Sequence, residues 1–179
     1  MKCDILIKDC TVMTQDYSTP EHMAVAIDHS MVLEVGETKE MEESMDILLV
    51  GTYTQHDAPA VLEKQELGKG IYLIPYNEIL GDVAGTPLII QMQNPSWVCL
   101  MKNRLFAVSE SEDAAEIVEY EVGVQEERLT AEKKAGLQMP GKASCHIEKD
   151  EKGQRLFVSD YGSGDLKVID ISEAGSPKL

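Results

Sequence analysis

The residue best suited to acid–base chemistry in this sequence is His146. It lies in the segment KASCHIE (Lys142 to Glu148), directly after Cys145 and next to an apolar run that is typical of a buried strand. Imidazole changes its charge near neutral pH, so it can accept the proton of a water molecule that attacks an ester. A structural histidine at the junction of two sheets is equally consistent with these residues, and both interpretations stay open here.

Other polar residues near the apolar strands are weaker candidates. Glu110 and Asp160 follow two repeated strands at positions that we take as equivalent, so repeat geometry explains them without catalysis. Arg104 and Arg155 begin those strands, and Arg128 lies in an acidic stretch. Bidentate phosphate binding usually relies on arginine, and none of the three is predicted to form a phosphate clamp.

Metal and cofactor sites are not predicted. No two histidines have the spacing of a metal pair, so turn or surface positions are expected for His22, His29 and His56. The four cysteines form no CxxC pair, and we expect buried or neutral thiols at Cys3, Cys10, Cys99 and Cys145. We expect Trp97 and Tyr161 to pack between sheets rather than to bind a ligand.

Composition limits the partners and the compartment. The net charge is −16, from 32 acidic against 16 basic residues, which disfavours binding to nucleic acid or to an anionic membrane. No apolar run approaches the roughly 18 residues of a membrane span. Asp4, Lys8 and Asp9 interrupt the place where a signal peptide would be apolar. These features predict a soluble, cytoplasmic protein.

The elements that must position His146 form a repeat. Leu49, Leu105 and Leu156 lie in similar apolar segments, spaced by 56 and 51 residues, a period near that of propeller blades. Each segment is followed by a second strand, and the later two are preceded by one. In EIVEYEV (Glu116 to Val122) apolar and acidic residues alternate, as in a strand with one wet face. The pattern predicts an all-β fold, a partial β-propeller of two to three four-stranded blades.

One segment conflicts with this pattern. Gln125 to Ala135 (QEERLTAEKKA) is rich in helix formers. The corresponding place in the preceding repeat is PLIIQMQ (Pro87 to Gln93), which is typical of a strand. The repeat therefore predicts an outer strand around Leu129 to Lys134.

The N-terminal residues belong to a different pattern. Strands are predicted at Asp4 to Met13 and Met23 to Glu37, the second broken by a polar turn at Asp28-His29-Ser30, which gives a hairpin or small sheet. This stretch resembles the first strands of metal-dependent amidohydrolases, although the HxH metal pair of that family is missing. We divide the chain into residues 1–38, a charged linker at 39–45, and the propeller at 46–179.

Several spaced motifs in residues 46–179 resemble the lactonase family of β-propellers. They are GTYT (Gly51 to Thr54), GIYL (Gly70 to Leu73), NPSW (Asn94 to Trp97), Cys145-His146 and YGSG (Tyr161 to Gly164). The resemblance implies a seven-bladed ring that hydrolyses sugar lactones or interconverts muconate and its lactone. About 135 residues correspond to two and a half blades. His146 matches the family's active-site histidine, whereas Ser144 and Asp160 replace the usual proline and asparagine.

The resemblance favours an N-terminal fragment of a lactonase such as 6-phosphogluconolactonase, an enzyme of the pentose phosphate pathway. His146 is the single catalytic candidate, no cofactor is expected, and the site is predicted to be incomplete in this chain. The partner would be a small sugar lactone, with self-association through open blade edges. A non-catalytic propeller that binds or scaffolds is the alternative, and a remnant of a metal-dependent amidohydrolase is a weaker one.

Overall fold

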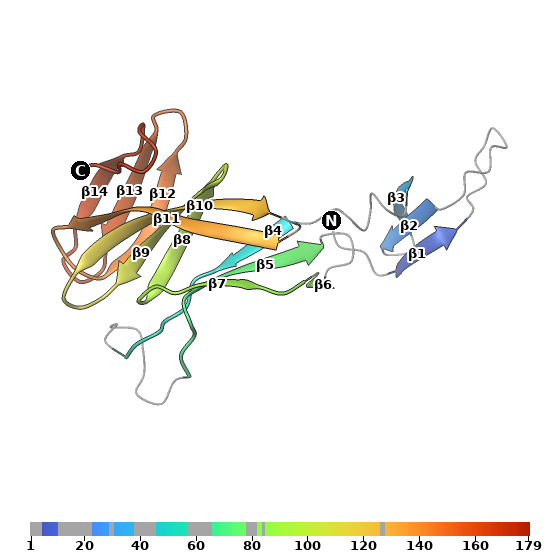
Figure 1. The fold of residues 1–179 in the computed structure, drawn as a ribbon, viewed down its shortest axis with the longest axis horizontal. Helices are drawn as coiled ribbons and strands as arrows, with labels where there is room; N and C mark the ends of the chain where they lie inside the picture. Colours follow the sequence, from blue (N-terminus) through green and yellow to red (C-terminus); the bar gives the residue numbers. More distant parts are fainter. Residues whose placement is uncertain are drawn as a thin grey trace. The chain divides into compact units, whose positions relative to one another are not determined.

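The computed structural model describes residues 5–10, 23–28, 31–37, 46–56, 66–77, 82–83, 85–125 and 128–179. Within these ranges the protein is all β, with antiparallel strands and no helix, as predicted (Figure 1). In that part of the chain no helix is long and apolar enough to cross a membrane. Two compact units are distinguished, one comprising residues 1–48 and 74–87, the other residues 49–73 and 88–179.

The N-terminal strands form a three-stranded antiparallel sheet in the order β1-β2-β3. They are β1 (Ile5–Cys10), β2 (Met23–Asp28) and β3 (Met31–Glu37). Asp28 at the end of β2 pairs with Met31 at the start of β3, so the two strands are antiparallel neighbours. The expected small sheet is therefore confirmed, while His22, His29 and the linker at 39–45 lie outside the described residues.

The first propeller sheet contains β4 (Asp46–Val50), β5 (Ile71–Asn77), β6 (Asp82–Val83) and β7 (Leu88–Ile90). The order is β4-β5-β6, and β7 also pairs with β5. Along β5 the residues alternate between buried and partly buried, with Ile71 and Leu73 fully buried. This is the period-2 pattern of a strand whose two faces differ in cover.

The second sheet is the most complete, in the order β11-β10-β9-β8 (Figure 1). Its strands are β8 (Pro95–Met101), β9 (Arg104–Glu110), β10 (Ala115–Gln125) and β11 (Arg128–Met139). The last of these confirms the outer strand predicted against helix propensity. Its pairing with β10, which extends from Gln125↔Arg128 to Ala115↔Met139, provides the stabilisation that overrides local preference.

The third sheet has the order β12-β13-β14, with β12 (Ser144–Asp150), β13 (Arg155–Asp160) and β14 (Leu166–Asp170). A short bridge between Asp170 and Lys178 follows it. Leu49, Leu105 and Leu156 all lie in strands. In the second and third sheets, Leu105 and Leu156 occupy the same register between their two neighbouring strands. The repeat is therefore structural in its second and third copies, and the leucine of the first copy also lies in a strand.

Burial follows from how each sheet is covered. Every residue of β9 after Arg104 is buried, because apolar side chains pack on both faces of this strand. The core joins the second and third sheets and includes Phe106, Val108, Ile117, Ile147, Leu156, Val158 and Ile169. On the other face of β14, Leu166 and Val168 are 70% and 46% exposed. The third sheet is thus covered on one face only among the described residues.

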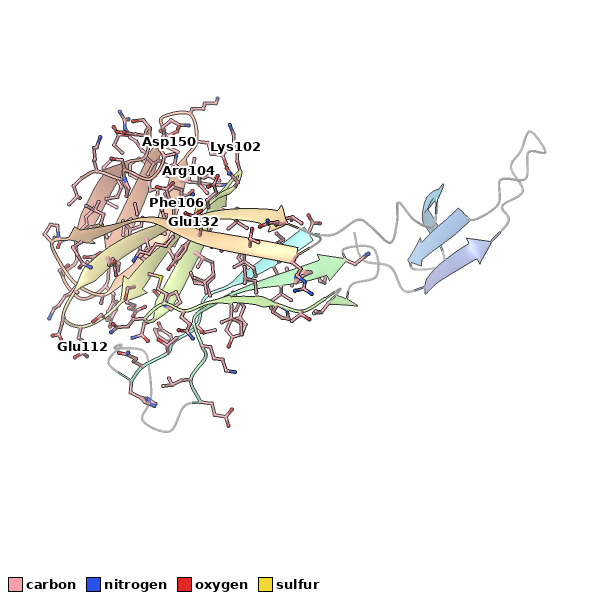
Figure 2. The ribbon with its side chains drawn as sticks, viewed as in Figure 1. Lys102, Arg104, Phe106, Glu112, Glu132 and Asp150 are labelled. Atoms are coloured by element: carbon pink, nitrogen blue, oxygen red, sulfur yellow. The ribbon has the colours of Figure 1, made fainter. Side chains whose placement is uncertain are left out.

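Polar contacts add a tie between the second and third sheets. Arg104 Nε forms an ion pair with Glu119 Oε1 at 2.7 Å, and Arg104 Nη1 donates to the carbonyl of Ile171 at 2.7 Å. The second oxygen of Glu119 accepts from the amide of Gly175 at 3.0 Å. The guanidinium carbon of Arg104 lies 5.0 Å from the centre of the Phe106 ring (Figure 2). The charges of Arg104 and Glu119 are thereby compensated where they are largely removed from water.

Two leucines of the third sheet allow a matched test of this packing. Leu156→Ala should lower the free energy of unfolding by about 3 kcal/mol, because Leu156 is fully buried and its loss leaves a cavity. Leu166→Ala is the same chemical change at a 70% exposed position and should have little effect. Urea denaturation of both variants measures the difference. Equal destabilisation by the two changes would contradict this description of the core.

Candidate active site

The candidate site lies on the edge strands of the second and third sheets. β8 is an edge strand of the second sheet and β12 is an edge strand of the third, and the two strands contact each other. Each begins with a β-bulge: pairing shifts between Pro95 and Trp97 in β8, and between Ser144 and His146 in β12. Because Pro95 pairs with Ser109 as Ser144 pairs with Asp160, Trp97 and His146 occupy equivalent positions in successive repeats.

His146 and Trp97 also contact each other. Their ring centres are 4.3 Å apart, and the ring planes are inclined by 51°. His146 is partly buried, and Trp97 is 42% exposed. A bulge re-aims the side chain that follows it, and both rings directly follow a bulge. The pair presents an apolar ring surface beside a group that can accept a proton.

The predicted equivalence of Glu110 and Asp160 is wrong by one residue. The amide of Glu110 donates to the carbonyl of Asn94, and the amide of Tyr161 donates to that of Ala143, so Glu110 corresponds to Tyr161. Asp160 corresponds to Ser109, which pairs with Pro95. The two acidic side chains therefore have different surroundings and need separate explanations.

Asp160 is buried in a network of polar groups. Its Oδ1 accepts from Ser144 Oγ at 2.8 Å. Its Oδ2 accepts from Ser163 Oγ at 3.2 Å and forms an ion pair with Lys167 Nζ. Both carboxylate oxygens are engaged, so Asp160 has the surroundings of a structural residue rather than of a free base. The serine that replaces the expected proline at 144 is held by the same network.

Glu110 binds a residue that the sequence did not single out. Tyr53, within the GTYT motif, donates its hydroxyl to Glu110 Oε2 at 2.9 Å. Burial, the hydrogen bond to Glu110 and the negative charge of Glu110 together raise the pKa of Tyr53 to about 12. The Coulomb interaction with Cys145 contributes in the same direction. Tyr53 thus stays protonated at neutral pH and holds residues 51–56 against the end of β9.

Asn94 is a second residue that sequence reasoning did not identify. It is fully buried, and its Oδ1 accepts from the backbone amides of Thr54 and Gln55 at 2.8 and 2.9 Å. Its Nδ2 donates to the carbonyl of Glu110 at 3.1 Å. Asn94 has a positive φ of 39°, which asparagine tolerates better than most residues. The Asn-Pro of the NPSW motif was the available signal, since this dipeptide favours a turn.

The other predicted residues lie outside this group. Arg104 forms an ion pair with Glu119, and Arg128 and Arg155 are exposed. His56 is exposed in a turn, as expected. Tyr161 is 72% exposed, so its predicted packing role is not found among the described residues. No three His, Cys, Asp or Glu side chains gather as metal ligands in that part of the chain.

A cleft of about 330 Å³ is found away from His146. It is lined by Asn103, Arg104, Glu119, Glu121, Lys134, Ala174 and Gly175. Its charged groups already form ion pairs with one another: Arg104 with Glu119, and Lys134 with Glu121. These charges are therefore matched within the protein, and the edge of β8 and β12 stays the better candidate.

Comparison with protein families decides the relationship. The family described as "Lactonase, 7-bladed beta-propeller" matches residues 47–179. The chain belongs to this lactonase family. No match was found among curated proteins. The family match covers all the motifs from GTYT to YGSG, which confirms the family resemblance that they carry.

Solved structures show the same fold over part of a ring. A candidate 6-phosphogluconolactonase from Bacteroides uniformis is similar, with a TM-score of 0.59, 21% identity, and coverage of 76% of this chain and 36% of that chain. A candidate 6-phosphogluconolactonase from Bacteroides fragilis has a TM-score of 0.58 and 21% identity, and the match covers 76% of this chain and 35% of that chain. A protein from Lactobacillus plantarum has a TM-score of 0.56 and 21% identity, and the match covers 75% of this chain and 36% of that chain. This lactonase-family chain thus spans about a third of the length of its structural neighbours.

The Tyr53–Glu110 contact predicts a pH effect. Because the folded pKa of Tyr53 is raised from 10.0 to about 12, the associated stability is complete below pH 10 and is lost as pH rises towards 12, where the unfolded chain releases this proton first. Glu110→Gln removes the charge but not the burial, which is the largest cause. The pKa of Tyr53 should therefore fall only part of the way back.

The ultraviolet absorbance of tyrosinate measures this titration. Tyr53→Phe identifies the step, since it removes the tyrosine that ionises at about pH 12. A Glu110→Gln protein with an unchanged tyrosine titration would show that Glu110 does not act on Tyr53.

Proposed function

We propose that this chain forms part of a sugar-lactone hydrolase, with 6-phosphogluconolactone as the substrate and His146 as the general base. The observation that carries the proposal is the position of His146: it follows a bulge on an edge strand of a lactonase-family propeller, partly buried and in ring contact with Trp97. The names of the two Bacteroides structures support the substrate class.

The chemistry assigned to His146 is proton transfer. Neutral imidazole accepts a proton from water as the water attacks the lactone carbonyl, which opens the ring to a carboxylate and a hydroxyl group. The developing oxyanion needs a donor or a cation. Among the described residues Arg104 is held by Glu119 and by the Ile171 carbonyl, so it does not supply this charge. We assign the oxyanion and phosphate contacts to blades beyond those described here, and we expect residues 1–179 alone to show no turnover.

Loss of His146 tests the proposal directly. In a chimera that joins residues 47–179 to the remaining blades of the Bacteroides uniformis protein, His146→Ala should slow lactone hydrolysis by about 100-fold or more, the usual contribution of a general base. His56→Ala is the matched control, because this exposed histidine lies in a turn. Acid release at constant pH measures the rate. Unchanged hydrolysis in the His146→Ala chimera would exclude His146 as the base, and a folded chimera without activity would favour a binding or scaffold module.

We also propose that residues 1–179 self-associate through the open face of the third sheet. Leu166 and Val168 are 70% and 46% exposed on β14, and an apolar sheet face that is exposed to water favours association. Sedimentation velocity should show concentration-dependent association of the parent chain and a shift towards monomer for Leu166→Lys with Val168→Lys. Lys substitutions at two exposed residues of the second sheet, Val124 on β10 and Glu132 on β11, serve as the control. A parent chain that is monomeric at all concentrations would contradict the proposal.

A further inference from the structure

Successive repeats hold the start of their edge strand by different means. In the second sheet Pro95 begins β8 opposite Ser109, and its pyrrolidine ring restricts the backbone before the bulge. In the third sheet Ser144 takes the equivalent position opposite Asp160. Serine has no ring to restrict φ, but its hydroxyl donates to Asp160 Oδ1 at 2.8 Å. A buried side-chain contact therefore stands where the preceding repeat has a proline.

The groups around this contact form one cluster, which we call the Asp160 cluster: Ser144, Asp160, Ser163 and Lys167. Asp160 and Lys167 form an ion pair in which the side chains are 0% and 5% exposed. Gly141, at φ +98°, lies so close that an added Cβ would be 2.3 Å from Asp160 Oδ2. The backbone at Gly141 thus covers the Asp160 carboxylate. An ion pair that is removed from water resists displacement, because movement of either side chain leaves a buried charge without its partner.

The Asp160 cluster reaches both rings of the candidate site. Ser144 is separated from His146 by Cys145 alone, the residue at which the register shifts. The carbonyl of Ser144 accepts a hydrogen bond from Ser96 Oγ at 3.2 Å. Ser96 immediately precedes Trp97 in the corresponding bulge of β8. Ser144 is therefore bonded through its side chain to Asp160 and through its carbonyl to the neighbouring sheet.

We propose that the Asp160 cluster is a positioning device that holds His146 against Trp97. The ion pair fixes Ser144, and Ser144 fixes the bulge of β12 together with that of β8 through Ser96. Ser144, Asp160 and Lys167 are then positioning residues, which act on the two rings through the backbone of β12 and β8. Their effect on the rings needs no ligand, whereas their effect on lactone hydrolysis rests on the proposed function.

The ring contact itself provides the readout. Trp97 is the only tryptophan of the chain, so its ring current acts on the His146 protons and its fluorescence is observed without overlap from another indole. In NMR spectra of residues 1–179, the His146 ring protons should be displaced relative to those in Trp97→Leu. Ser144→Ala should remove most of this displacement and shift the Trp97 emission, because the cluster can no longer hold the bulge. Ser96→Ala should reduce it in the same direction.

Rescue and control variants separate positioning from general loss of stability. Ser144→Pro should restore the displacement, since Pro95 holds the equivalent position in the preceding repeat. Leu156→Ala opens a cavity in the same sheet without touching the Asp160 cluster and should leave the displacement in place. A Ser144→Ala protein that keeps the full displacement, or a Leu156→Ala protein that loses as much of it as Ser144→Ala, would overturn the proposal.

The two proposals can fail separately. In the chimera, Ser144→Ala should lower kcat with little change in KM, because a positioning residue acts on the base rather than on substrate binding. If the parent chimera shows no hydrolysis while the ring displacement responds to Ser144→Ala, the proposed function is wrong and the positioning role stands. If hydrolysis depends on His146 while the displacement of the His146 ring-proton signals is unchanged in Ser144→Ala, the positioning role is wrong and the proposed function stands.

Discussion

A β-sheet with two apolar faces must be covered on both sides, and this constraint determines most of what the chain does as a structure. The second sheet meets it: β9 is buried along almost its whole length, and the core cluster joins this sheet to the third. The third sheet meets it on one face, where Leu156 and Ile169 are buried, while Leu166 on the other face stays in water. Burial along β14 therefore alternates, because one face of the strand lies in the core and the other faces water.

The same stacking places two edge strands side by side and so creates the candidate site. β8 and β12 are edge strands of their sheets, and Trp97 and His146, which contact each other, each follow a bulge at the start of their strand. Trp97 and His146 are therefore products of one repeated backbone feature that carries different side chains. The repeated bulge determines where the two side chains lie, and the residue type at each position determines what chemistry it can do.

Much of the fold could be predicted from the sequence because its signals recur. Three copies of an apolar strand outweighed the helix propensity of the segment that became β11, and the polar turn before β3 was visible locally. Less of the candidate site could be predicted from the sequence. Glu110 and Asp160 were assigned to equivalent positions, and the backbone pairing shows an offset of one residue that strand composition does not reveal. Contacts such as Tyr53 to Glu110 join residues 57 positions apart, and they depend on how sheets stack rather than on any local pattern.

The two departures from the family pattern show why single positions are hard to interpret in isolation. Taken alone, Ser144 removes the restriction that proline gives, and Asp160 adds a charge at a turn. In the structure these two side chains are hydrogen-bonded to each other, and Lys167 balances the charge. The cost of burying a carboxylate is offset only if all three residues are present, so each substitution is favourable because of the others. The orientation of the His146 ring therefore depends on residues of three strands, and Ser144, two positions before it in the sequence, is only one of them.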